Sequence, residues 1–202
     1  YCIPPDELQK FTNIYYRAVI ENPTLEYLTE KQIDNGPILV DFDFRYNLNI
    51  TERQHDEDTI IAIIDLYSQK LKDIVIFTED RDFPIYVFEK PSINTIEKEQ
   101  LVKDGIHIII GIQLSHELQL YLRDQVLKDI ANVCDELPIE NTWDSVLDRG
   151  ISAGHTNWQM YGSRKPNNEA YQLTKYYRAK IDINDGEFAM DEIETNTIDL
   201  RY

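Results

Sequence analysis

The sequence predicts an α/β (α+β) fold in which mixed sheets are flanked by helices. Three observations support this class. Strand-like and helix-like segments alternate along most of the 202 residues. Residues 37–46 and 105–113 place apolar side chains at every second position, which is typical of strands. Thr51 and Ser115, which are common helix-capping residues, each precede a segment with helical spacing of apolar residues.

The first half of the predicted sheet begins after the turn Asn35-Gly36, where residues 37–46 form a strand. A helix is expected from Thr51 to about Leu71, because acidic residues fill its first turn and an apolar stripe follows. Residues 84–90 form the next strand, with the apolar run Ile-Tyr-Val-Phe at its centre.

The second half begins with the strand 105–113 and a helix after Ser115, in which apolar residues recur every four positions up to Ile130. Two late strands, about 157–162 and 170–178, are rich in Tyr, Trp and Thr. We therefore expect a single domain over residues 1–181, which is long enough to be a catalytic domain. Residues 182–202 are strongly acidic and are expected to be a C-terminal segment or linker that leads to further domains, or else an ordered element.

Composition narrows the class of protein. Lys and Arg number 20 against 37 Asp and Glu, so the net charge is −17, which excludes a generic basic nucleic-acid coat. A hydrophobic content of 42% excludes a disordered chain. No apolar run approaches the roughly 20 residues of a membrane helix, so no membrane partner is expected. Cys2 and Cys134 are too few for a zinc site made of cysteines, and no zinc is expected.

The pattern Asp41-Phe42-Asp43 is the sharpest chemical feature. Side chains alternate across a strand, so Phe42 and its apolar neighbours face one side while Asp41 and Asp43 face the other. Two like charges side by side are tolerated when a cation lies between them, and carboxylates suit Mg²⁺ or Mn²⁺. The alternative is a pair of aspartates that simply face water.

His107 lies at the centre of the segment Gly105–Gly111. Ile106 and Ile108 share one face of this strand, whereas His107 shares the other with the two glycines. Because glycine has no side chain, a ligand could approach the imidazole closely. The alternative is a histidine whose hydrogen bonds are satisfied within the sheet.

Residues 143–165 carry a third feature, an acid after apolar residues, then a small loop and a strand that ends in Gly-Ser-Arg-Lys. Asp148 follows Val146 and Leu147, and Asp144 lies four residues earlier. Six basic residues and one acid occupy residues 149–180, so the most basic window of the chain lies here. Arginine and lysine next to small residues favour phosphate binding, although a charged turn is the alternative.

Taken together, these motifs resemble the archaeo-eukaryotic primase superfamily. The segments DFDFR, VFEKPS, KDGIHII and NWQMYGSRKP, with a following Tyr-x-Leu-Thr strand, are most similar to the primase domain of primase-helicases of large cytoplasmic DNA viruses. The resemblance covers about residues 37–177. It implies a core with an RNA-recognition-like module packed on a second α/β module, and synthesis of primers from nucleoside triphosphates on a DNA template.

The resemblance also implies roles for single residues. Asp41 and Asp43 match the first metal-binding motif, and Asp148 matches the third acid better than Asp144 by its spacing to the Trp158 strand. These three acids are then the catalytic and metal-binding residues of a two-metal Mg²⁺ or Mn²⁺ site. The remaining matches are expected to bind the incoming nucleotide: His107, Ser163, Arg164, Lys165 and Lys103. Related enzymes often carry Asn-Arg where this chain has Asn157-Trp158, and Arg164 or Arg45 is expected to compensate.

The expected partners are a DNA template and primer, nucleoside triphosphates and a fused or bound superfamily-3 helicase, with the host cytoplasm as the place of action. A basic strip of Arg164, Lys165, Lys175 and Arg178 is expected to give weak, salt-dependent DNA binding. Three other classes stay open: a glycosyltransferase that uses Asp-x-Asp, a metal-dependent nuclease, and a non-catalytic interaction module of a replication complex.

Overall fold

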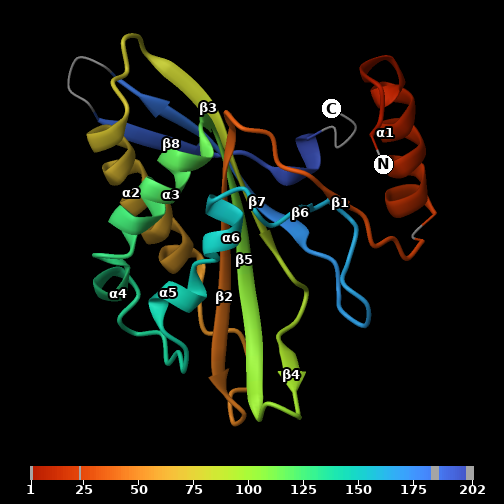
Figure 1. Ribbon diagram of the computed structural model, residues 1–202. Coiled ribbons are helices and arrows are strands. Elements are labelled where there is room, and N and C mark those ends of the chain that lie inside the picture. Colours follow the sequence, from red (N-terminus) through yellow and green to blue (C-terminus); the bar gives the residue numbers. More distant parts are fainter. Residues whose placement is uncertain (1, 23, 183–186, 199–202) are drawn as a thin grey trace.

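The computed structural model describes residues 2–22, 24–182 and 187–198. Its main layer is an antiparallel sheet with the strand order β2–β5–β3–β7–β8, and β4 pairs with β5 beside that path (Figure 1). The strands are β1 (Thr29–Glu30), β2 (Gly36–Asn47), β3 (Arg81–Glu89), β4 (Asn94–Ile96), β5 (Leu101–Leu114), β6 (Trp158–Gln159), β7 (Gln172–Ile181) and β8 (Phe188–Glu192). The helices are α1 (Leu8–Tyr16), α2 (Glu57–Ile74), α3 (His116–Val126), α4 (Ile130–Val133), α5 (Trp143–Val146) and α6 (Arg149–Ser152), with short helical turns at Pro5–Glu7, Arg17–Glu21 and Thr195–Thr197.

The elements β2, α2, β3, β5 and α3 follow the order of a split β-α-β unit. β5 lies between β2 and β3 and is antiparallel to both. A fourth strand beside β2 is reduced to two isolated antiparallel bridges, Phe42–Leu147 and Tyr46–Ile139. This α+β arrangement confirms the predicted fold class.

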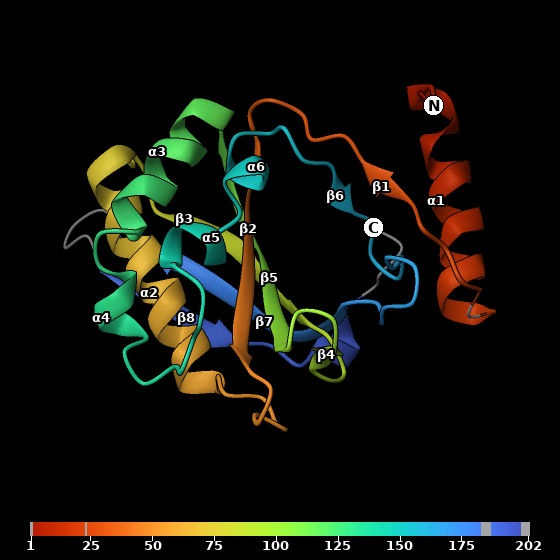
Figure 2. The same ribbon diagram turned by 60° about the horizontal axis from the view of Figure 1, so that its bottom comes forward.

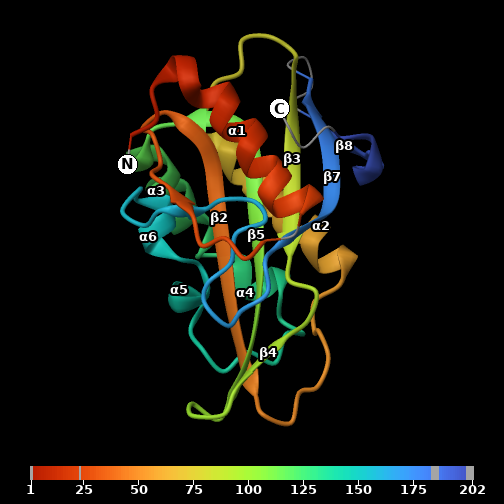
Figure 3. The ribbon, with the colours of Figure 1, turned by 90° about the vertical axis from the view of Figure 1, so that its right-hand side faces the viewer.

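Helices α2, α3 and α4 cover one face of the sheet (Figure 2). The alternation of β2 and β5 turns Phe42 and Ile108 toward these helices, where they are fully buried with Ile64. The opposite face meets a smaller unit, in which β1 pairs with β6 and α1 lies outside them (Figure 3). No residue of α1 is buried. None of the helices in the described ranges is long and apolar enough to cross a membrane.

The predicted strands 37–46, 84–90 and 105–113 are confirmed as β2, β3 and β5. The predicted start of the first helix at Thr51 is wrong. Asp56 caps α2 instead: its side chain accepts the backbone N–H of Thr59, and the Thr59 hydroxyl faces the backbone N–H of Asp56. Residues 51–55 therefore form a loop, which is free to bring Arg53 and His55 against the sheet.

The later elements differ more from the prediction. Ser115 does cap α3, but that helix ends at Val126 and a separate turn, α4, follows from Ile130. The late strands are β6, which is only two residues long, and β7. Within the acidic segment 182–202, β8 pairs with β7, while residues 183–186 and 199–202 lie outside the described residues. Helix α1 was not anticipated, although five of its nine residues are apolar or aromatic.

Candidate active site

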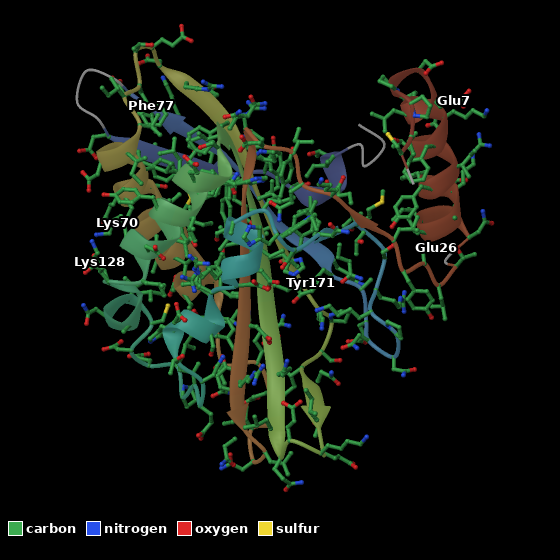
Figure 4. The ribbon with its side chains drawn as sticks, in the orientation of Figure 1. Glu7, Glu26, Lys70, Phe77, Lys128 and Tyr171 are labelled. Atoms are coloured by element: carbon green, nitrogen blue, oxygen red, sulfur yellow. The ribbon has the colours of Figure 1, made fainter. Side chains whose placement is uncertain are left out.

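A cavity of about 510 Å³ opens on the sheet face that the helices leave uncovered. This volume is within the usual range for a site that holds a small ligand. Polar and charged side chains from β2, β5 and the segment after α5 line much of it, and Tyr171 lies beside it at the middle of the molecule (Figure 4). Its charged lining residues include Asp41, Asp43, Lys90, Lys103, His107, Asp144, Asp148 and Lys165.

Asp41 and Asp43 project into this cavity from one face of β2, as the alternation predicts. Asp41 and His107 are directly opposite each other in the β2–β5 pair, and His107 Nε2 lies 3.4 Å from Asp41 Oδ1. Burial alone would raise the pKa of Asp41. The charge and hydrogen bond of His107, together with nearby Lys165 and Lys90, outweigh burial and lower that pKa. Asp41 is therefore held as a carboxylate.

Three lysines surround the two acids. Lys103 Nζ lies 3.3 Å from Asp43 Oδ2. Lys90 approaches from the position directly after β3, and Lys165 from the loop before β7. Burial lowers the pKa of Lys90 most and the proximity of Lys165 adds to this effect, while Asp43 and Asp41 oppose it. The arrangement places cations around an acidic centre, as a site for a metal-bound polyphosphate requires.

The ring of His107 is held between two aromatic side chains. Its centroid lies 3.6 Å from that of Tyr171, in a stacked geometry, and 4.6 Å from that of Trp158. His107 was expected to be uncovered by its flanking glycines, but only 10% of its side chain is exposed. The reason is that a Cβ atom at Gly105 would lie 2.7 Å from the Tyr171 hydroxyl, so the glycine makes room for Tyr171 rather than for a ligand.

The third acid is placed by the residual fourth strand. The backbone N–H of Asp148 donates to the carbonyl of Asp41 at 3.0 Å, immediately after the Phe42–Leu147 bridge. Asp148 Oδ1 accepts the backbone N–H groups of Gly150 and Ile151 and thereby caps α6. Asp144 also lines the cavity, but its carboxylate pairs with Arg123 and 76% of its side chain is exposed. These contacts favour Asp148, although both acids reach the same cavity.

The edge of β2 that carries the acids is hydrogen-bonded by an irregular segment rather than by a strand. Asn141 is the main contact: its side-chain amide donates to the carbonyl of Asp43 at 2.9 Å and accepts the N–H of Arg45 at 3.1 Å. Together with the Asp148 N–H on Asp41, these bonds fix β2 on its outer side. The two aspartates are consequently held on a strand that is paired along both edges.

The pair Asp41 and Asp43 fits an open metal site better than a site in which protein side chains supply every ligand. In the described ranges, no three carboxylate, imidazole or thiol groups converge into a ready-made metal cluster. Mg²⁺ usually retains several waters and is held by one or two carboxylates plus substrate phosphates, which matches two acids in an open, lysine-lined cavity. Asp148 contacts β2 through its backbone N–H, and one of its carboxylate oxygens is engaged as a cap.

The remaining nucleotide-binding candidates, Ser163 and Arg164, do not line the cavity that holds Asp41 and Asp43. Ser163 is only 1% exposed, and its hydroxyl contacts Tyr15 at 2.7 Å and accepts the N–H of Leu28 at 3.0 Å. It joins the N-terminal segment to the loop after β6 and lines a second, smaller cavity. Arg164 is half-buried and lines neither of the two cavities.

The expected basic strip is dispersed. Lys175 lies on the helix-covered side of β7, where it pairs with Glu57 of α2 at 2.8 Å and with Glu192 at 2.9 Å. Arg178 points to the opposite side and has Asp191 as its cross-strand neighbour. The strip predicted from the linear sequence is therefore wrong for Lys175, because alternation along β7 separates it from Arg178.

A buried ionic network lies on the other side of the sheet from the lysines. Arg53 donates to Asp104 at 2.9 and 3.1 Å, to Glu89 at 2.9 Å and to the carbonyl of Lys90 at 2.7 Å. His55 shares Glu89 at 2.8 Å. Because Glu89 and Asp104 directly adjoin Lys90 and Lys103 in sequence, one guanidinium ties together the two strand ends that carry site lysines.

Sequence reasoning missed Lys90, Tyr171 and Arg53. Lys90 had a signal, since it follows Phe88 by two positions at the end of a predicted strand and so shares its face. Tyr171 lay in the predicted strand 170–178 and in the Tyr-x-Leu-Thr motif, but neither pattern indicated that it contacts His107. Arg53 had no signal, because it lies in a segment without periodicity.

Comparisons with known proteins agree with the fold. The family described as the C962R protein N-terminal AEP domain, where AEP denotes archaeo-eukaryotic primase, matches residues 1–177. A protein of Acanthamoeba polyphaga mimivirus that bears the name helicase L207/L206 is 30% identical over 171 residues, which is 83% of this chain. The chain spans 17% of that relative's length. The split β-α-β core, the Asp41–Asp43 strand and the opposing His107 all lie inside the matched range, and the chain belongs to the C962R-type N-terminal archaeo-eukaryotic primase domain family.

Proposed function

We propose that this domain is a nucleotidyltransferase that makes and extends primers on a DNA template in viral DNA replication. One observation carries the proposal: Asp41 and Asp43 share one face of β2, opposite His107, in a cavity that also holds three lysines. The family supports the same class of reaction, and the mimivirus relative supports the viral setting. A helicase segment in the same polypeptide and action in the host cytoplasm belong to this proposal, and the relative's name supports the former.

The charges in the cavity fit phosphoryl transfer. Asp41, Asp43 and Asp148 would hold Mg²⁺ or Mn²⁺, which would activate the primer 3′-hydroxyl and neutralise charge on the triphosphate. Lys90, Lys103 and Lys165 would orient the phosphates by positive charge, since all three line the cavity before a nucleotide arrives. His107 keeps its ring orientation through Tyr171 and Trp158 and can donate a hydrogen bond to a phosphate oxygen.

The test is extension of a primed DNA template by the wild type, by Asp41→Asn and by Asp43→Asn, with Mg²⁺ or Mn²⁺. Each substitution removes one charge and keeps the shape of the side chain. We expect extension to fall at least about a hundredfold, because metal-ion stabilisation is worth several kcal/mol. Asp73→Asn, at an exposed position near the end of α2, is the matched control and should keep full activity.

Direct Mn²⁺ binding by calorimetry should weaken in both site variants and not in the control. Wild-type extension by Asp41→Asn would overturn the proposal. Cleavage of DNA or transfer of a sugar from a nucleotide sugar, lost in the same two variants, would instead identify a nuclease or a glycosyltransferase.

A further inference from the structure

The sheet face opposite helices α2, α3 and α4 carries aromatic side chains beyond the catalytic cavity, which is the one lined by Asp41 and Asp43. Phe88 of β3 lies opposite His107 of β5, and its ring contacts that of Tyr161 at 5.7 Å between centroids. Tyr86, two residues earlier on β3, shares this face and lies 6.5 Å from Phe88. Tyr176 of β7 stacks on Tyr86 at 5.0 Å with an interplanar angle of 12°. These four residues, Phe88, Tyr161, Tyr86 and Tyr176, form what we call the aromatic row.

A second cavity, of about 120 Å³, lies where the aromatic row meets the catalytic cavity. The two cavities share His107, Trp158, Gln159 and Tyr171 in their walls. At this size it holds one planar ring rather than a whole nucleotide, since whole-ligand sites are usually at least about 300 Å³.

The chemistry of the small cavity suits an uncharged ring. The described residues that form its walls include no lysine or arginine, and they contribute one carboxylate, Glu30, whose pKa is raised by burial. A phosphate group would therefore find no strong cation there. Phe88, Trp158 and Tyr161 offer flat faces, and every nucleobase can stack on such faces whatever its sequence.

We propose that the aromatic row binds successive unpaired bases of a single DNA strand, with the small cavity receiving the base nearest the catalytic cavity. The row continues from Phe88 to Tyr86 and Tyr176, away from the acids, which is more stacking surface than one incoming nucleotide would use. This inference rests on the proposed function in one respect: the strand is the template, led along the sheet toward Asp41 and Asp43.

The test measures binding of a labelled single-stranded oligothymidine by fluorescence anisotropy, in parallel with an abasic oligonucleotide of equal length. The variants are Phe88→Leu and Tyr86→Leu, which keep an apolar side chain in the sheet but remove the ring. Tyr121→Leu is the matched control, because Tyr121 is 53% exposed on α3 at the other side of the sheet. Thermal melting of each variant checks that it is folded.

We expect Phe88→Leu and Tyr86→Leu to weaken binding of the normal strand about fivefold or more, since stacking on one aromatic side chain contributes that much. Binding of the abasic strand and the behaviour of Tyr121→Leu should stay unchanged. Equal losses for normal and abasic strands, or no loss in folded variants, would overturn the proposal. So would unchanged strand affinity with a raised KM for nucleoside triphosphate, because the row would then hold the incoming base.

Strand binding needs no turnover, so the two proposals fail separately. Base-dependent binding through the row in a protein that extends no primer would sustain this inference and refute the proposed function. Primer extension that depends on Asp41, together with a strand affinity that is unchanged in Phe88→Leu and Tyr86→Leu, would sustain the proposed function and refute this inference.

Discussion

Replacement of Glu89 by glutamine tests the buried network beneath the site lysines. Burial by itself raises the pKa of Glu89, but hydrogen bonds from His55 and Thr174 and the charge of Arg53 outweigh it and lower the pKa from 4.5 to about 2. Only 9% of the Glu89 side chain is exposed, so solvent screens these interactions little. The lowered pKa corresponds to about 3 kcal/mol of folding free energy at neutral pH, at about 1.4 kcal/mol per pKa unit.

Because the folded-state pKa is depressed, this contribution is complete above pH 4.5 and is lost as the pH falls toward 2. Urea unfolding of the wild type and of Glu89→Gln should therefore differ by about 3 kcal/mol at pH 7 and by about 1 kcal/mol at pH 3. The control is Glu57→Gln, which breaks a half-exposed pair with Lys175 and should cost no more than about 1 kcal/mol.

Two results would refute this reasoning. A loss in Glu89→Gln that is the same at pH 7 and pH 3 would mean that packing, and not charge, is responsible. A loss no larger than that of Glu57→Gln would mean that Arg53 and His55 find other partners when the carboxylate is removed.

Three further substitutions test the site. Gly105→Ala should destabilise the fold and displace Tyr171, because the new methyl group would lie 2.7 Å from its hydroxyl; thermal melting and Tyr fluorescence measure this, and an unchanged melting temperature contradicts it. Ser163→Ala should cost about 1–3 kcal/mol in urea unfolding, since Tyr15 loses a partner, while KM for nucleotide stays unchanged; a raised KM with wild-type stability would restore its predicted nucleotide contact. Lys90→Met should lower kcat/KM for nucleotide about tenfold or more, as for a lost charge-assisted hydrogen bond. Steady-state primer extension at saturating metal measures this, and an unchanged kcat/KM would mean that Lys90 does not reach the phosphates.

The residues on β2 and β5 were predictable because strand alternation is a local property. Once Phe42 is committed to the core, Asp41 and Asp43 must share the other face, and the same holds for His107 beside Ile106. That these two strands pair, and in a register that sets Asp41 against His107, could not be read from either segment alone. Register depends on the turns and on packing against the helices.

The supporting residues were not predictable for a different reason. Thr51 and Asp56 are both good capping residues, and the apolar stripe that starts at Ile60 is compatible with either start. Because α2 begins after Asp56, residues 51–55 form a loop that carries Arg53 into the buried network. No periodic pattern in the sequence predicts this position of Arg53. Tyr171 likewise reaches His107 only through the path of the loop before β7.

The irregular pairing along the outer edge of β2 also bears on how the protein behaves at high concentration. An open edge strand with apolar neighbours is a template on which other chains can add strands and aggregate. Here Gln119 accepts the N–H of Leu39, Asn141 satisfies the groups of Asp43 and Arg45, and the backbone of Asp148 satisfies Asp41. The strand that bears the acids thus offers little free backbone along these positions to a second molecule, so the protein can present a long sheet edge without recruiting copies of itself.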